Sequence, residues 1–448
     1  MDDFSLVMAD EEAGEELVKG DEDGCKDDAP DDVDNHGVLE SDEHALVLAR
    51  AEVLRGKGCH GKPKAYHGQH GELIDLPTNC LHGNHISTHF IENDLHDWNT
   101  SAVTTMSNMF IYNRKLSVLN TNSWDTGAVT NMSYMFYDTR ALSEIQGIEN
   151  WDTGAVTDMS FMFSRYDGLT TLATLDLRGW DVSNVTTMAS MFNGANGLTT
   201  LNVTGWQPGL ATTGVNLTSL FEGTSKLQTL TGIDTWDTTQ ATTMNRMFQG
   251  IGTTAPGVTS LDLSGWNVSN VTTMASMFNG ANKLQTLDTT GWNPEKVTTM
   301  NSMFYNATAL NTITGTANWQ TDAVTNLGYT FVGTALTNLD LSGWNTAAVT
   351  NMGYTFNNSP LVTIDLKGWT TASITANYAM ECMFQNTSAL TNLDMRTADF
   401  DKATTVYPNM FRGSNIGGTT MIVKDDAVIN DLTVRLNLSP RPFNIITP

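Results

Sequence analysis

The sequence predicts an α/β solenoid of about twelve units, each 25–30 residues long and built from one short parallel strand and one short helix. Three features of the sequence predict it. Tryptophans recur at a regular spacing, an L-x-x-L-x-L segment recurs before many of them, and a Met-x-x-Met-Phe segment follows most of them. All eleven tryptophans fall in one series, from Trp98 to Trp369, at spacings of 25 to 30 residues. A unit of this size buries too little to fold alone, so the units are expected to stack over residues 98–411.

The strand is expected at the L-x-x-L-x-L segment. Leu175 and Leu177 alternate with polar residues, which is the period of a strand with one buried face. The same alternation recurs at Leu261/Leu263 and Leu339/Leu341. Twelve such strands in parallel predict one continuous sheet along one side of the solenoid.

A turn and a helix are expected after the strand. The Asp or Asn that follows most tryptophans, such as Asp181 after Trp180, is expected to hold the turn through its side chain. Four apolar residues then recur at helical spacing, and this stripe predicts a helix of at most two turns that ends at Gly194: Val185, Met188, Met191 and Phe192. The Met, Phe and Trp side chains are expected to form a stacked core.

The motif W-[DN]-[TV]-[SG]-x-V-T-x-M-x-x-M-F is clearest in residues 180–192 and 266–278. It resembles the BspA-like leucine-rich repeat family, also described as a Mycoplasma-type lipoprotein repeat of unknown function. The resemblance covers about residues 98–411. It implies a leucine-rich-repeat-like solenoid, commonly found on bacterial or protist surface proteins, for which adhesion or ligand binding is the usual proposal. It implies no chemistry.

The flanks differ in composition from the repeats. Residues 1–43 hold 18 of the 49 acidic residues, and we expect 1–40 to be an acidic disordered tail. Residues 41–97 are expected to form an N-terminal cap with a His/Cys-rich loop, and 412–448 a C-terminal cap, because the ends of a solenoid need covering.

Charge and hydropathy exclude several classes of function. The net charge of −26 argues against nucleic acid as a partner, since phosphate binding needs clustered Lys and Arg. No apolar run is long enough for a transmembrane segment. The N-terminus lacks the basic and apolar regions of a secretory signal. The resemblance implies a cell-surface or extracellular protein, and the missing signal leaves a cytoplasmic location open.

The candidate binding residues lie between the inward leucines of the strands or just after them, and strand alternation places them on the outer sheet face. Such a mainly acidic face suits a cationic or hydroxyl-rich ligand. They are Asp176, Arg178, Asp262, Asp288, Asp340, Asp365, Lys367, Asp394 and Arg396.

A metal site is a separate hypothesis for residues 56–96. Cys59, His60, Cys80 and His82 could supply the four ligands that Zn²⁺ takes, although their spacing matches no standard zinc motif. A Cys59–Cys80 disulfide, or free residues in a Gly/His-rich loop, are the alternatives.

The function expected from the sequence is non-enzymatic binding or adhesion, with a protein or a glycan as the ligand. Catalysis has little support, because the repeats contain no His, and no two carboxylates stand out as an acid/base pair. No cofactor is expected. An intracellular interaction scaffold is the first alternative, and a metal-dependent module at 56–96 is the second.

Overall fold

The computed structural model describes residues 98–165, 171–211, 213–376, 378–396, 409–415 and 418–423, with the backbone of two further strands, Ile74–Asp75 and Asn444–Ile446. The expected tail at 1–40 lies outside the described residues, as do Cys59, His60, Cys80 and His82. The predictions made for those segments stay predictions.

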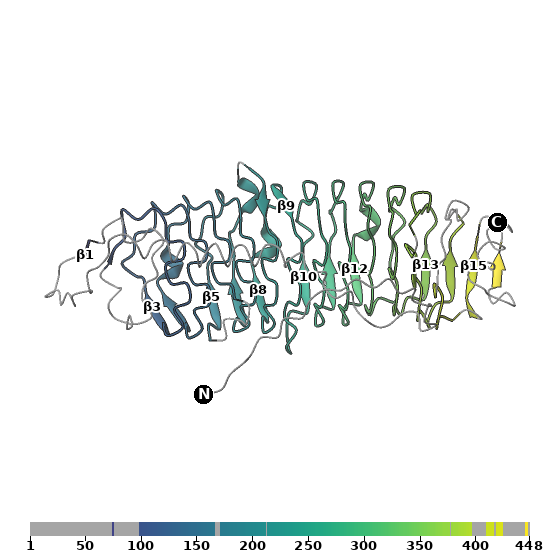
Figure 1. Ribbon diagram of the computed structural model, residues 1–448, viewed down its shortest axis with the longest axis horizontal. Helices are drawn as coiled ribbons and strands as arrows, with labels where there is room; N and C mark the ends of the chain where they lie inside the picture. The colour runs from purple at the N-terminus through teal and green to yellow at the C-terminus, as the bar shows by residue number, and fades with distance from the viewer. Residues whose placement is uncertain are drawn as a thin grey trace, which may run out of the picture.

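The described chain winds into an elongated parallel β-solenoid, with its coils stacked one beside the next along the long axis (Figure 1). Short strands lie side by side along one edge, and corresponding residues pair in register, as Leu175 does with Leu201 and Leu261 with Leu287. These strands are β3 (Val118–Asn120), β4 (Glu144–Gln146), β5 (Thr174–Asp176), β6 (Thr200–Asn202), β8 (Thr229–Thr231), β10 (Ser260–Asp262), β11 (Thr286–Asp288), β12 (Thr312–Thr314), β13 (Thr363–Asp365), β14 (Asn392–Asp394), β15 (Thr420–Ile422) and β16 (Asn444–Ile446).

A second line of parallel pairing runs along another side of the coils. It consists mainly of single bridges, such as Thr105 with Asn131 and Thr273 with Thr299. Its short strands are β7 (Val215–Asn216) and β9 (Ala241–Thr243), which pair with each other. A separate parallel pair joins β1 (Ile74–Asp75) to β2 (Trp98–Asn99), at the first tryptophan of the series. The described residues also contain four short 3-10 turns: η2 (Ile148–Asn150), η3 (Pro208–Leu210), η4 (Ile233–Thr235) and η5 (Thr316–Asn318).

The strand-side sheet is interrupted, and the prediction of one continuous sheet is therefore wrong. Its strands form four hydrogen-bonded groups, with breaks between β4 and β5, between β8 and β10, and between β12 and β13. The first two breaks fall where successive tryptophans are 29 and 30 residues apart, from Trp151 to Trp180 and from Trp236 to Trp266. Length alone does not break the sheet, because β6 and β8 pair although Trp206 and Trp236 are also 30 residues apart. The tryptophan ladder continues past all three breaks.

Two aromatic ladders run through the interior and confirm the predicted core. The eleven tryptophans stack ring on ring, with centroids 5.6–6.4 Å apart. Twelve phenylalanines, from Phe110 to Phe411, stack in the same way at 5.2–5.8 Å. All are buried, and the methionines of the Met-x-x-Met-Phe segments pack with them. Each coil therefore buries its apolar face against the equivalent face of its neighbours.

The expected helix in each unit is wrong. In the coil of Phe192, the N–H of Met191 bonds three residues back to Met188, whereas the N–H groups of Ser190 and Phe192 bond across to Thr218 and Leu220 of the next coil. A helix would send every N–H four residues back along its own segment. Ser190 and Gly194 also have φ of 56° and 68°, which is incompatible with a right-handed helix. The segment is a chain of tight turns hydrogen-bonded between coils.

Candidate functional site

Six aspartates form a row on the strand side of the solenoid. Five of them are the third residue of a strand, so coils in register place them along one line. Asp262 pairs directly with Asp288, and Asp365 with Asp394, whereas the partner of Asp176 is Asn202 and the other partner of Asp288 is Thr314. Asp340 occupies the same position in a coil where no strand is assigned. The acidic row is thus Asp176, Asp262, Asp288, Asp340, Asp365 and Asp394, and the predicted cations Arg178, Lys367 and Arg396 each lie two residues after one of its members.

Each member of the acidic row also closes a turn. Its Oδ1 accepts the backbone N–H two residues later, as Asp262 does from Ser264 at 3.0 Å and Asp365 from Lys367 at 2.8 Å. The same bond forms at the other four members. The sequence assigned this turn-closing role to the residues after tryptophan, where it also occurs, as at Asp181 and Ser183. It missed the role in the acidic row, although Ser, Thr or a basic residue two positions later was a visible signal.

Hydrogen bonds keep much of this row ionised. The side-chain and backbone bonds from Thr290, with a further bond from Thr314, lower the pKa of Asp288 below its ordinary value. The bonds from Ser342 lower the pKa of Asp340 in the same way. Burial by itself raises the pKa of Asp394, but the hydrogen bonds and charge of Arg396 outweigh it, and the net shift is downward. These carboxylates are negative at neutral pH.

Two cations of the predicted site are paired with the acidic row itself. Arg178 Nη2 lies 2.7 Å from Asp176 Oδ2, and both side chains are well exposed. Arg396 contacts Asp394 through two guanidinium nitrogens, and Asp394 is buried. The structure thus brings the predicted residues to one side of the solenoid, as a string of local pairs and turns.

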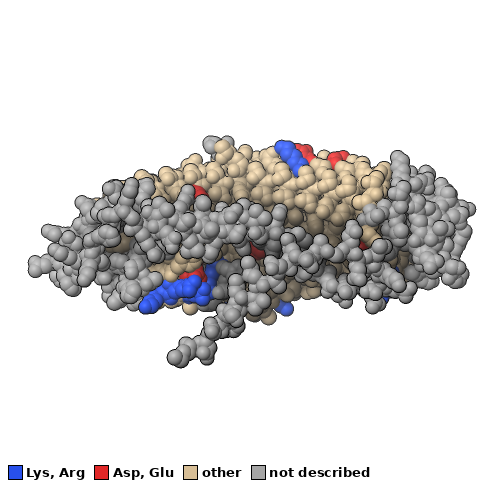
Figure 2. Space-filling view, viewed as in Figure 1, with Lys and Arg blue, Asp and Glu red and all other residues tan. Residues whose placement is uncertain are grey.

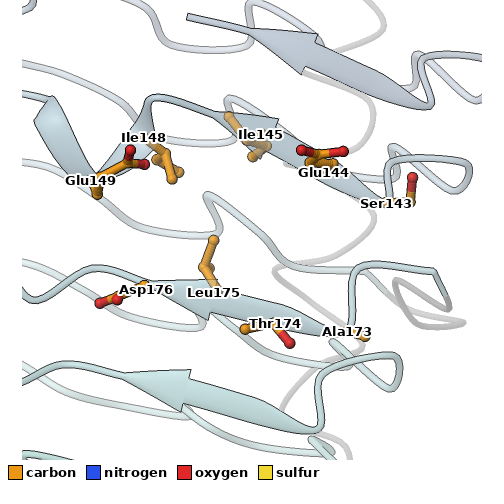
Figure 3. Close-up of a pocket in the computed structure, with 9 residues that line it drawn as sticks. All are labelled: Ser143, Glu144, Ile145, Ile148, Glu149, Ala173, Thr174, Leu175 and Asp176. Carbon is orange, nitrogen blue, oxygen red and sulfur yellow. The ribbon is translucent and has the colours of Figure 1, made fainter. Parts of the chain in front are cut away.

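A shallow open depression of about 320 Å³ lies where the sheet is interrupted between β4 and β5. Figure 3 shows Leu175 projecting from β5 into the space between the two strands, with Glu144 on β4 above it. Glu144, Glu149 and Asp176 supply carboxylates around it, and Ile145 and Ile148 supply apolar surface. Glu144 and Glu149 are not among the residues predicted from the sequence, although the long spacing from Trp151 to Trp180 marked the irregular coil.

The acids around this depression already have partners within their own coil. Glu144 accepts the Gln146 amide at 3.1 Å, and Glu149 is 3.4 Å from the Asn150 amide. Among the residues that the structure describes, no group of three or more His, Cys, Asp or Glu is placed to hold a metal ion. The same part of the chain has no helix long and apolar enough to cross a membrane.

Comparison with known families identifies the repeats. The family model described as "Mycoplasma protein of unknown function, DUF285" matches four overlapping stretches, residues 84–206, 143–253, 215–315 and 311–418. Together these stretches span about three-quarters of the chain. No match is found among curated proteins.

Proposed function

The chain belongs to this DUF285 family of Mycoplasma proteins of unknown function, and on that premise we propose that it is a non-enzymatic binding or adhesion protein. Its ligand is a protein or a glycan that carries positive charge, and the acidic row is the surface that meets it. The resemblance of the repeats to BspA-like surface proteins, for which adhesion is the usual proposal, supports this function. A location at the cell surface belongs to the same proposal.

The observation that carries the proposal is the acidic row itself. Five of its six aspartates are exposed or half-buried, and only Asp394 is buried. The bond that all six share is the one from the backbone N–H two residues later, as at Asp262 and Asp340. Asn forms the same bond in two other coils, where Asn120 and Asn202 accept the N–H two residues later at 3.1 Å. The negative charge is therefore separable from the turn, and a ligand is one use for it.

The test removes charge and keeps the turns. The triple variant Asp262→Asn, Asp288→Asn, Asp340→Asn should still form the solenoid, with a lower melting temperature at neutral pH because Asp288 and Asp340 stabilise the fold in their ionised form. It should bind the ligand found in a protein and glycan screen at least tenfold more weakly. Binding by the parent should also weaken with salt, since the Debye length falls from ~10 Å at 0.1 M to ~3 Å at 1 M.

A matched control changes the same charge elsewhere. Asp125, Asp152 and Asp181 close the corners after three tryptophans and can be replaced by Asn together. This control should bind as the parent does. Equal affinity of both triple variants would rule out the acidic row as the site.

An intracellular interaction scaffold remains the alternative function. The same solenoid surface would serve it, so the binding assay does not separate the two. Localising the natural full-length protein does: a cytoplasmic pool without surface exposure would favour the scaffold.

A further inference from the structure

Within the described part of the chain, the outer face of the strand side is exposed. Its side chains come from the first and third residues of each strand, such as Thr286 and Asp288 in β11. In β8, β10, β12 and β13 both of these residues are exposed. The described surface seen in Figure 2 carries few charged atoms, which lie in small separate groups. A line of like charges on this sheet face is therefore a distinct feature of the molecule.

The acidic row has counter-charges at its two ends and none at its centre. The ends are paired with Arg178 and Arg396. Between them, in the continuously described residues 213–376, Asp262, Asp288 and Asp340 form no ion pair with another described residue. The hydrogen bonds that these three carboxylates accept come from neutral groups. Four successive coils thus hold three uncompensated negative charges.

The densest group of basic residues in the chain precedes the solenoid. Residues 53–71, here called the basic segment, contain no acid, and four bases lie within ten residues of one another: Arg55, Lys57, Lys62 and Lys64. Gly, His and Pro make up most of its other residues. The basic segment lies outside the described residues. Its charge is opposite to that of the acidic row, and both belong to the same chain.

The length of chain before the solenoid is sufficient for the basic segment to reach the centre of the acidic row. The first described strand, β1, begins at Ile74 and pairs with β2 at the first tryptophan. Lys64 and Arg55 precede Ile74 by ten and nineteen residues, which span at most ~33 Å and ~63 Å at ~3.3 Å per residue. Asp262 and Asp340 lie about seven and ten coils from β1, or ~34 Å and ~48 Å at ~4.8 Å per coil. The reach of the four bases therefore covers the centre of the row.

We propose that the basic segment docks on the outer sheet face of its own chain, along Asp262, Asp288 and Asp340. This inference rests on the proposed function, because it names a first partner of the same acidic row. Attachment to the same chain gives the segment an effective concentration on the order of millimolar, so each charge pair can be weak. The docked segment competes with an external cationic ligand for the row.

The acidic residues 1–43 are the other partner that charge alone would allow. The aspartates of the row are held in place by the turns that they close, so the row loses little conformational freedom when it is bound. Their positions along the coils also match an extended segment that runs along the solenoid. Both points favour the row over residues 1–43.

Zero-length cross-linking of the full chain tests the proposal. A carbodiimide joins a lysine amine to a carboxylate that contacts it, and peptide mass spectrometry identifies the pair. At low salt we expect links from the lysines of the basic segment to Asp262, Asp288 or Asp340. Salt at ~1 M should reduce these links at least tenfold, because the Debye length is then ~3 Å. No link to the acidic row, or links only to residues 1–43, would overturn the proposal.

Mixing isotopically labelled and unlabelled chains separates a contact within one chain from a contact between two copies. Both populations have the same sequence, so the cross-linking chemistry is identical. Links within a single copy support the proposal. Links that join labelled to unlabelled chains would show that the segment docks on a second copy, and docking within one chain would then be wrong.

A synthetic peptide of residues 53–71, kept reduced, tests the competition for the row. The variant Arg55→Gln, Lys57→Gln, Lys62→Gln, Lys64→Gln should bind this peptide at least tenfold more tightly than the parent does, because its own segment no longer occupies the face. Calorimetry on the two full chains measures both affinities. Equal affinities, or no binding to either chain, contradict docking of the segment.

A matched control removes four positive charges elsewhere. The control variant changes four lysines at turns of the described coils, outside the acidic row: Lys115→Gln, Lys226→Gln, Lys283→Gln, Lys296→Gln. It should bind the peptide as weakly as the parent does. If it binds as tightly as the segment variant, the gain comes from net charge and the proposal is wrong. The proposed function fails by a different result, namely unchanged binding of the screened ligand to the triple aspartate variant.

Discussion

At the scale of single residues, the turns that replace the expected helices depend on an unusual backbone conformation. Twelve non-glycine residues, one in each Met-x-x-Met-Phe segment or its equivalent, have φ between 50° and 61°. None of them is β-branched. The left-handed conformation costs an L-residue about 1–2 kcal/mol. It persists because it directs the N–H outward to the next coil, as at Ser276, whose N–H bonds to Asn301 at 2.8 Å.

The first prediction concerns that conformation. Ser276→Val should destabilise the solenoid by about 1–2 kcal/mol relative to Ser276→Gly, because a β-branched side chain is a strong outlier at positive φ. Urea unfolding followed by tryptophan fluorescence gives the difference. Ser260→Val, at an exposed strand position of β10, is the control and should change stability by less than about 0.5 kcal/mol. Equal effects of valine at both positions would contradict the role of φ.

The second prediction concerns the phenylalanine ladder. Phe192 is fully buried, with Phe163 and Phe221 each 5.7 Å away. Phe192→Ala should cost about 3–5 kcal/mol, because it leaves a cavity between two rings that cannot close up. Hydrogen exchange should show the coils next to Phe192 opening first, since each coil is stabilised by its neighbours. Neutral unfolding behaviour would argue that the ring is not part of the core.

At the scale of the element, each regular coil has three corners closed by a side chain. In one coil, Asp262 accepts the N–H of Ser264, Asn267 that of Ser269, and the Thr273 hydroxyl that of Ala275. The strands are short and form few hydrogen bonds with each other, so many backbone N–H groups at the corners would lack an acceptor. These side chains supply the acceptors. This explains the high content of Asp, Asn and Thr.

The third prediction follows from the charged corners. The folded pKa values of Asp288 and Asp340 lie below the ordinary value of 3.8. Their ionised forms therefore stabilise the fold fully above pH 3.8, and this contribution is lost as the pH falls below it. The melting temperature should drop in that range, and less steeply for Asp288→Asn with Asp340→Asn. An unchanged slope would show that these bonds do not favour the charged form.

Sequence patterns predicted the strands and the core better than the segment between them. The alternation at Leu175 and Leu177 reports which side chains face inward, and burial confirmed it. Met188, Met191 and Phe192 also face inward, but their spacing of three arises from consecutive tight turns and not from a helix. The spacing of apolar residues predicts which side chains point inward. It does not predict which carbonyl accepts each backbone N–H, because that carbonyl lies in the next coil. Thr, Asn and Ser around these residues, which are poor helix formers, were the available signal.

Of the candidate sites, the acidic row could be predicted, because strand alternation alone places it. The ion pairs that Arg114, Arg140 and Arg165 form with Asp138 could not be predicted. Arg114, Arg140 and Arg165 are about 25 residues apart in sequence, and they meet only because successive coils are in register. Asp138 looks like any surface acid until its burial is known. The spacing of residues along the sequence does not show which side chains of different coils contact each other.

At the scale of the whole molecule, the fold is a sum of nearly equal layers, and this gives the fourth prediction. Deleting Trp266–Gly291 removes one full repeat and joins Gly265 to Trp292, which restores an equivalent sequence. The variant should fold into a solenoid shorter by about 4.8 Å, with lower stability. Small-angle scattering and circular dichroism measure both. Deleting only residues 266–278 should prevent the later coils from folding, because it shifts each of them by half a turn. If this half-repeat variant folds as well as the full-repeat deletion, stacking of the coils does not depend on register.

Similar layers have a consequence for folding. If one coil stacks on its second neighbour and loops out a repeat, most Trp, Phe and Met contacts are reproduced, so the misaligned state is nearly degenerate with the native one. Irregular coils remove this degeneracy. The bulge at Val215 and Asn216, the 3-10 turn η3 and the break between β8 and β10 each fit at one place along the stack only. The coils that differ from the regular repeat thus disfavour folds in which a coil stacks on the wrong neighbour, although they form fewer local hydrogen bonds.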